Sequence, residues 1–399
     1  MRTPTSTIIL SCIVFIALGI LTASIGPILP DLASNTGSAL EAVGAIFTAI
    51  FLGAFLAQIG AGTLTDKLGP RPVLIVGMLI VSAGMLGVTF SRSLPVMLAS
   101  GLLAGLGHGA VDICVNVLVA KVFKDRSVAA VNLVNFFFGV GAVAGPAMAS
   151  YTIKQWNTGI PVIWIGVGMV LLSIPFIALF LLSPINKPVK VTHEAGRPFY
   201  LSPLLWIAGV ILFIYVGAEN SMGGWTATYM QKTTALSADK AALVVSGFWM
   251  ALTAGRLVGA ILGTRWTSNR LLFVSLAGAV LGGLLLAVST GGLTASIIAV
   301  LLVGFFFGPI YPTTFTISAS LFSDSSGKAA GLIVALASLG GMALPPLQGV
   351  VITRFGTSLS VWLIAVYTIG MILANITRSF MIHRQNSSQP ILSQPDPAK

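Results

Sequence analysis

The chain has 399 residues, of which 56% are hydrophobic and only 8% are charged. Soluble proteins carry about 25% charged residues, so this composition excludes a water-soluble fold and indicates an integral membrane protein. The net charge of +11 is attributed to basic loops on one side of a membrane, and we expect no nucleic-acid partner.

Twelve apolar segments, each about 20 residues or longer, predict twelve transmembrane helices embedded in a lipid bilayer. The first apolar segment resembles a secretory signal peptide. However, it runs to about Pro30 and eleven more spans follow, so we interpret it as an uncleaved first span. The predicted spans are residues 7–30, 42–64, 72–91, 95–121, 127–153, 160–183, 203–230, 241–263, 270–289, 293–321, 328–352 and 359–380.

Lys and Arg are distributed unevenly over the predicted loops. Of the 21 such residues, fifteen fall on the side of the N-terminus, five fall on the opposite side, and Arg256 lies inside a span. Because cytoplasmic loops retain Lys and Arg, both termini are predicted to be cytoplasmic. The expected location is the plasma membrane.

A polar break at 183–202 divides the twelve spans into six and six. An ungapped shift of 199 positions places Gly105 on Gly304 and Pro146 on Pro345, which indicates an internal repeat. We therefore predict an all-α membrane protein built from two six-helix repeats that rock around a midplane site. The predicted parts are an N-terminal bundle (1–183), a cytoplasmic linker (184–202), a C-terminal bundle (203–380) and a disordered cytoplasmic tail (381–399).

The loop between the second and third spans reads GTLTDKLGPR from Gly62 to Arg71. It resembles the G-x-x-x-D-[RK]-x-G-x-[RK] loop of the major facilitator superfamily, and the span count and the repeat extend this resemblance over nearly the whole chain. In that family the loop helps to lock the outward-facing state, so the resemblance implies gating or charge-pairing roles for Asp66, Lys67 and Arg71. The alternative is an ordinary solvated loop charge.

Three formal charges lie deep in predicted spans, namely Asp112 in the fourth, Glu219 in the seventh and Arg256 in the eighth. A charge in hydrocarbon costs about 3 kcal/mol, so each needs a partner, a wet cavity or titration. Arg256 is expected to neutralise a carboxylate. We expect Asp112 to load a proton, with structural pairing to Arg256 or to neighbours on the fourth span as the alternative.

On the fourth span His108, Asp112 and Asn116 follow the spacing i, i+4, i+8, so on a helix they share one face. His108 is a candidate proton shuttle, because its charge changes near physiological pH. The alternative is a neutral His that is bonded to a neighbouring helix. Asn116 can contribute to the substrate site or to interhelical hydrogen bonds.

The seventh span combines hydrogen-bonding groups with aromatic faces, a mixture that suits a polyol. Its three glycines at 217, 223 and 224 are predicted to unwind the helix and free backbone groups for a cavity. On the eighth span Trp249 is expected to line the same cavity, with core packing as an equal alternative. The predicted substrate-binding residues are Glu219, Asn220, Asn116, Trp225, Tyr311 and Trp249.

The stretches Gly107–Asn116, Gly217–Glu219 and Gly308–Thr314 resemble the fucose/glucose/galactose permease branch of the superfamily. This resemblance implies that Asp112 is the proton- or sodium-coupling carboxylate and that Glu219 faces the substrate. Pro309 and Pro312 are expected to bend the tenth span. The first span lacks the Asp that a family member can carry there, which leaves the stoichiometry and the ion open.

These patterns predict a symporter that moves a small sugar-like solute together with H⁺, or alternatively Na⁺, and that works as a monomer without a metal or another cofactor. A proton-coupled exporter of drugs or metabolites is the alternative. The Gly141–Pro146 element favours it by resemblance, whereas Gly101 stands where exporters carry Arg. A receptor or an enzyme is a remote third reading, since no nucleophile–base pair or ATP-binding motif is present.

Overall fold

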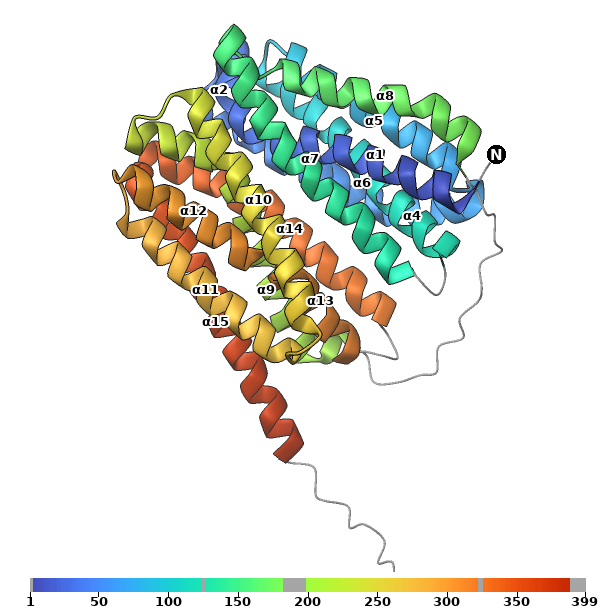
Figure 1. The fold of residues 1–399 in the computed structure, drawn as a ribbon, viewed down its shortest axis with the longest axis vertical. Coiled ribbons are helices and arrows are strands. Elements are labelled where there is room, and N and C mark those ends of the chain that lie inside the picture. Colours follow the sequence, from blue (N-terminus) through green and yellow to red (C-terminus); the bar gives the residue numbers. More distant parts are fainter. Residues whose placement is uncertain (1–2, 124–126, 182–198, 322–325, 388–399) are drawn as a thin grey trace, which may run out of the picture.

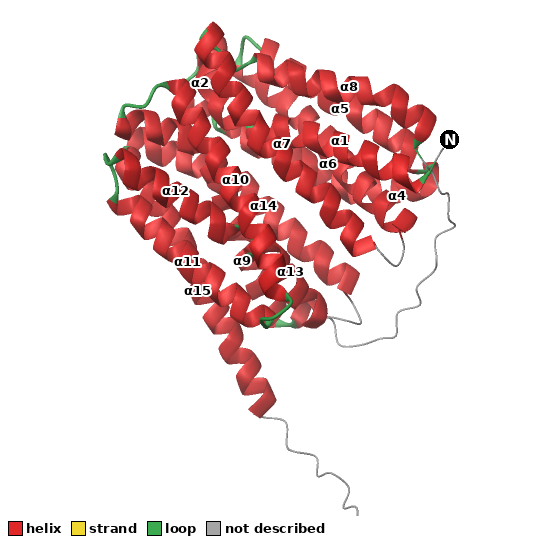
Figure 2. Ribbon diagram, viewed as in Figure 1, coloured by secondary structure: helices red, strands yellow, loops and turns green. Residues whose placement is uncertain are grey.

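The computed structural model describes residues 3–123, 127–181, 199–321 and 326–387, and all of its regular elements are helices (Figures 1 and 2). Twelve helices are long and apolar enough to cross a membrane, which confirms the predicted span count. The elements are α1 (Pro4–Ala23), α2 (Ile25–Thr36), α3 (Leu40–Val43), α4 (Ala45–Leu68), α5 (Pro70–Phe90), α6 (Leu94–Phe123), α7 (Ser127–Trp156), α8 (Pro161–Phe180), the short 3-10 helix η2 (Phe199–Leu201), α9 (Pro203–Thr234), α10 (Ala238–Gly263), α11 (Ser268–Val288), α12 (Leu293–Phe307), α13 (Ile310–Leu321), α14 (Ser326–Arg354) and α15 (Thr357–Ser387).

Two hydrophobic clusters divide the molecule, one formed mainly by α1–α8 and the other mainly by α9–α15. Figure 1 shows the corresponding two groups of helices side by side, with α7 and α10 adjacent at their border. The central linker at 182–198, which was predicted from its polar composition, lies outside the described residues.

Close helix crossings within each half depend on glycine. A Cβ on Gly105 would lie 2.0 Å from the Ile50 carbonyl oxygen, so α6 and α4 approach at a distance that only glycine permits. The second half repeats this crossing between α12 and α10, where a Cβ on Gly304 would lie 2.6 Å from the Phe248 oxygen. Equivalent crossings join α7 to α1 and α14 to α9 through Gly141 and Gly340.

The predicted bend in the tenth span is confirmed, because α12 ends at Phe307 and α13 begins at Ile310. The predicted unwinding of the seventh span is wrong, since α9 is one continuous helix from Pro203 to Thr234. Its glycines serve close packing instead. A Cβ on Gly223 would lie 2.9 Å from the Trp249 ring, and one on Gly224 would lie 2.5 Å from Phe47 of the other half.

The two halves are joined at the end of the molecule that contains the α9–α10 and α14–α15 turns, which we call the closed end. The Trp225 ring of α9 is packed there between Gly44 of the first half and Gly349 of α14. The Thr353 hydroxyl of α14 donates a hydrogen bond to Glu41 of α3. In a third contact between the halves, the Thr48 hydroxyl of α4 donates a hydrogen bond of 2.7 Å to the Met342 carbonyl of α14.

α15 continues to Ser387, so the predicted disordered tail is helical at its start. Arg384 lies over the ring of Phe380, one turn earlier, at 5.5 Å, and such an i, i+4 pair supports the helix. Residues 388–399 lie outside the described residues.

Candidate functional site

Asp112 is held by a network of carboxamides on α6 and α7. The Asn116 amide donates to an Asp112 carboxylate oxygen at 3.0 Å, and the Asn135 amide donates to the Asn116 oxygen at 3.2 Å. All three side chains are half-buried. Among the described residues no Lys, Arg or His lies within ion-pair distance of Asp112. Asp112 is therefore a hydrogen-bonded carboxylate without a cationic partner.

Glu219 and Arg256 form an ion pair between α9 and α10, with 3.2 Å between the Glu219 Oε1 and the Arg256 Nη2. The Glu219 side chain is 11% exposed, whereas the Arg256 side chain is 34% exposed, so the guanidinium is the more accessible member. This confirms that Arg256 neutralises a carboxylate. The partner is Glu219, so Arg256 is not the partner of Asp112, whereas the other structural alternative, pairing with a neighbour on its own helix, is present as the Asn116 hydrogen bond.

Tyr311 of α13 interacts with charged groups of both halves. Its phenol interacts electrostatically with Asp112 of the first half and with both Glu219 and Arg256 of the second half. Its ring stacks on Phe315 at 6.4 Å and is tilted against Tyr215 at 6.1 Å. The structure therefore brings Asp112 and the Glu219–Arg256 pair to one shared region.

Two other predicted residues lie near this region but are turned to other partners. His108 packs edge-on against Phe138, with 6.4 Å between ring centroids, and its imidazole makes no hydrogen bond to the described residues. The Asn220 amide donates to the Val216 carbonyl of its own helix at 2.8 Å. Asn220 follows Glu219 directly, so it is rotated about 100° away from the ion pair.

The two predicted tryptophans differ in their surroundings. The Trp225 indole N–H donates to the Pro345 carbonyl at 2.7 Å, and the side chain is buried at the closed end. Its packing closes that end of the molecule. Trp249 is buried beside Gly223, and its N–H has no acceptor among the described residues.

The loop motif forms the turn between α4 and α5. Gly69 has φ of 84°, a conformation that favours glycine, and Pro70 begins α5. The Arg71 guanidinium donates to the Leu181 carbonyl at the end of α8, while Lys67 is exposed. The Asp66 side chain lies outside the described part of the structure, so its gating role stays a prediction.

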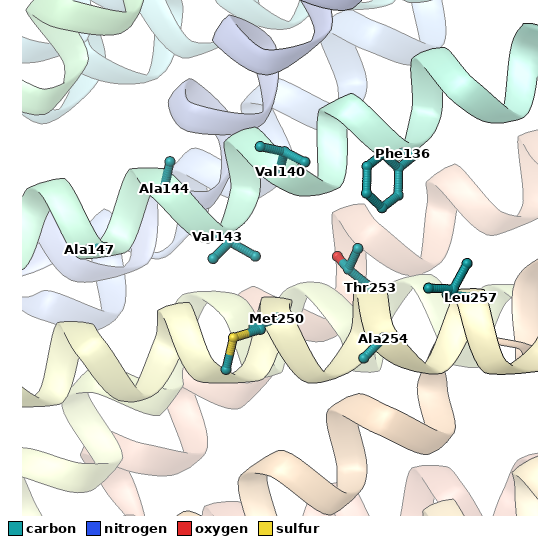
Figure 3. Close-up of a pocket in the computed structure, with 9 residues that line it drawn as sticks. All are labelled: Phe136, Val140, Val143, Ala144, Ala147, Met250, Thr253, Ala254 and Leu257. Carbon is teal, nitrogen blue, oxygen red and sulfur yellow. The ribbon is translucent and has the colours of Figure 1, made fainter.

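A groove of about 460 Å³ lies between α7 and α10, and Figure 3 shows that side chains from both helices line it. The lining residues are Phe136, Val140, Val143, Ala144, Ala147, Met250, Thr253, Ala254 and Leu257. This wall is almost wholly apolar, so the groove is unsuited to a polar solute and is separate from the charged region. In the searched part of the chain, no cluster of His, Cys, Asp or Glu is suited to a metal ion.

Sequence reasoning did not assign Tyr215, although it precedes Glu219 by one helical turn. Its hydroxyl lies beside Glu219 and Arg256 and interacts electrostatically with both. The i, i+4 spacing on an apolar span was the signal that could have identified it.

Comparisons with known proteins agree with this architecture. Residues 9–343 and 207–393 match the profile of the Major Facilitator Superfamily. The human Sodium-dependent glucose transporter 1 is 25% identical over 378 residues, which cover 85% of this chain and 72% of that protein. The Saccharomyces cerevisiae Bypass of stop codon protein 6 is 25% identical over 386 residues, with 87% and 77% coverage.

Solved structures show the same fold at lower identity. A nucleoside transporter superposes with a TM-score of 0.78 at 13% identity, covering 94% of this chain and 99% of that one. A D-xylose-proton symporter gives 0.77 at 13% identity, with 94% and 97% coverage. The E. coli fucose:proton symporter gives 0.65 at 19% identity, with 94% and 99% coverage.

Proposed function

The chain belongs to the major facilitator superfamily of membrane transporters, and we propose that it moves an uncharged polyhydroxylated solute, a sugar, by proton symport. The observation that supports this proposal most directly is that two carboxylates with different partners lie in one region. Asp112 lacks a cationic partner among the described residues, whereas Glu219 has Arg256. One group can change its charge, and the other keeps a balanced charge.

Asp112 is the proposed proton carrier. A carboxylate without a counter-charge is costly in a membrane, and protonation removes that cost. Asn135 fixes the Asn116 amide so that an N–H, rather than an oxygen, faces Asp112. A sodium ion needs oxygen ligands, so this arrangement favours H⁺ over Na⁺. The name of the human relative favours sodium, so replacing Na⁺ with K⁺ in the transport assay distinguishes the two ions.

The Glu219–Arg256 pair is the proposed substrate anchor. A sugar hydroxyl can accept a hydrogen bond from the guanidinium and donate one to the carboxylate, and it adds no net charge to the pair. The names of similar proteins mention glucose, fucose, xylose and nucleosides, which all carry several hydroxyls. An uncharged polyol suits the site better than an anion or a cation does.

Alternating access follows from the proposed orientation. With cytoplasmic termini in the plasma membrane, the closed end around Trp225 faces outside. In this conformation we expect Asp112 to exchange its proton with the cytoplasmic side. Loading from outside requires the first half to separate from Trp225, which is a rocking movement of one half against the other.

The exporter alternative rested on the Gly141–Pro146 element. In the structure a Cβ on Gly141 would lie 2.0 Å from the Ile16 oxygen, so helix packing is sufficient to require this glycine. Because the packing explains the element, no observation on the described residues favours export over symport.

Uptake into proteoliposomes tests this function. Wild-type protein is expected to accumulate at least one of D-glucose, L-fucose, D-xylose or uridine when a proton gradient is imposed, and a protonophore should abolish accumulation. Asp112→Asn should keep downhill exchange but lose accumulation. Asp31→Asn is the matched control, because Asp31 binds the α7–α8 turn outside the spans and should not affect coupling.

Accumulation by Asp112→Asn would contradict the assignment of the coupling site. Loss of uptake on replacing Na⁺ with K⁺, with no response to a proton gradient, would identify sodium as the ion. If none of the four solutes enters, while cells that express the protein become drug-resistant, the symport proposal fails.

A further inference from the structure

Facing surfaces of α9 and α10 form a strip of polar groups around the ion pair. Tyr215, Glu219 and Gly223 follow the spacing i, i+4, i+8 on α9 and therefore share one face. Arg256 and Trp249, seven residues apart on α10, also share a face, and they meet that strip. Arg256 bonds Glu219, and the Trp249 ring lies over Gly223.

Two hydrogen-bond donors in this strip have no acceptor within hydrogen-bond distance, although the Tyr215 hydroxyl still interacts with the nearby Glu219 carboxylate. The Tyr215 hydroxyl and the Trp249 indole N–H are both buried and make no hydrogen bond within the described residues. Buried donors are rarely left unpaired, because a donor removed from water without a partner loses its hydrogen bond to water and gains none in return. A phenol or an indole also cannot turn back to the carbonyl of its own helical turn, as a Ser or Thr hydroxyl can.

Other aromatic donors on the same helix are satisfied. The Trp225 N–H donates to the Pro345 carbonyl at 2.7 Å, and the Tyr229 hydroxyl lies 3.0 Å from the Ser296 hydroxyl. On α9 and α10 the unpaired aromatic donors are Tyr215 and Trp249, on the face that carries Glu219 and Arg256, so a ligand is a suitable partner for them.

We propose that the Tyr215 hydroxyl and the Trp249 N–H donate hydrogen bonds to hydroxyl or ring oxygens of the substrate, which makes Tyr215 a specificity-determining residue. This inference rests on the function proposed above. With Glu219 as acceptor and Arg256 as a further donor, the strip offers both kinds of partner that each hydroxyl requires. A solute with oxygens at several positions of a ring satisfies the strip, whereas an apolar drug leaves its donors unpaired.

Tyr311 packs beside this strip. Its ring is tilted against Tyr215 at 6.1 Å, and it is half-buried while Tyr215 is fully buried. The unpaired donors belong to a substrate-free state, and the bound state pairs them.

The test uses full-length protein in proteoliposomes and compares each sugar taken up by the wild type with its single-deoxy analogues. D-Glucose, L-fucose and D-xylose are the starting panel. Tyr215→Phe removes one oxygen and should raise KM about 10-fold for the parent sugar, a hydrogen-bond-sized effect. It should raise KM little for the one deoxy analogue that lacks the contacted hydroxyl. Trp249→Phe should show the same selective loss at a different ring position.

Tyr367→Phe is the matched control, because the Tyr367 hydroxyl is also buried and unpaired, although it lies on α15. It should leave the discrimination between parent and deoxy sugars unchanged. Equal KM increases for every analogue in Tyr215→Phe, or unchanged KM values in both variants, would overturn the inference while the transport function stands. If the wild type takes up no sugar, the proposed function fails first and the inference fails with it.

If Tyr215→Phe does not fold, Trp249→Phe and the intrinsic fluorescence of the wild type on sugar addition provide the second measurement. Pairing of the indole N–H by the sugar should change the emission of wild-type protein and leave that of Trp249→Phe unchanged. An identical emission change in both proteins would overturn the role of Trp249.

Discussion

Removing the Glu219 carboxylate should destabilise the protein by leaving the Arg256 guanidinium without its counter-charge. Breaking a buried ion pair costs about 3–5 kcal/mol. Glu219 is 11% exposed but Arg256 is 34% exposed, so water can solvate the stranded guanidinium in part. We therefore expect Glu219→Gln to cost about 1–3 kcal/mol, less than a fully buried pair would.

The double variant Glu219→Gln/Arg256→Gln separates the ion pair from the packing of its side chains. Because the second change removes the stranded charge, the double variant should be at least as stable as Glu219→Gln alone, with a coupling energy of about 1–2 kcal/mol. Thermal unfolding of the four proteins in the same detergent measures this quantity. Strict additivity of the two single changes would refute the argument, because it would mean that the 3.2 Å contact carries no net interaction.

Three further predictions concern packing and the closed end. Gly105→Ala should lower stability by about 3 kcal/mol through a backbone clash, whereas Gly60→Ala on an open surface of α4 should be neutral or slightly stabilising in the same unfolding assay. Trp225→Ala should empty the space beside Gly44 and raise the labelling rate of a cysteine introduced at the adjacent buried Val43, in a background without native cysteines; an unchanged rate would contradict the closing role. Burial raises the pKa of Asp31 above its ordinary value, so the ionised form is disfavoured in the folded protein. The folded state therefore loses stability as the pH rises through the pKa that Asp31 has in the fold. Asp31→Asn should therefore raise the unfolding temperature by about 2 °C at pH 7 but not at pH 3, and a lower temperature at pH 7 would show that the ionised hydrogen bonds dominate.

The fold could be predicted from the sequence because bilayer thickness sets the length of a span and polar breaks set its ends. Prolines at positions 70, 161 and 203 begin helices in the structure, at or close to the predicted starts. The error at α9 has a physical cause. Glycine weakens an isolated helix, but its contribution reverses where another helix packs directly against it, and only the tertiary structure shows which helices do so.

The site was predictable within one helix and less so between helices. The i, i+4 spacing placed Asn116 beside Asp112, and the structure contains that hydrogen bond. Whether Arg256 pairs with Asp112 or Glu219 depends on distances between helices that are remote in sequence, so residue spacing could not decide it. Trp225 illustrates the same limit, since an aromatic ring on a polar span suits either a sugar or a closed interface.

The position of Trp225 also has a consequence for how the protein is made. Although α9 belongs to the second half, this side chain is part of the hydrophobic cluster of the first half. A ribosome delivers the first half to the membrane earlier, and at that moment the space beside Gly44 has no indole to fill it. The first bundle is therefore completed only after α9 has been inserted, so a separately expressed first half should assemble fully only when the second half is supplied with it.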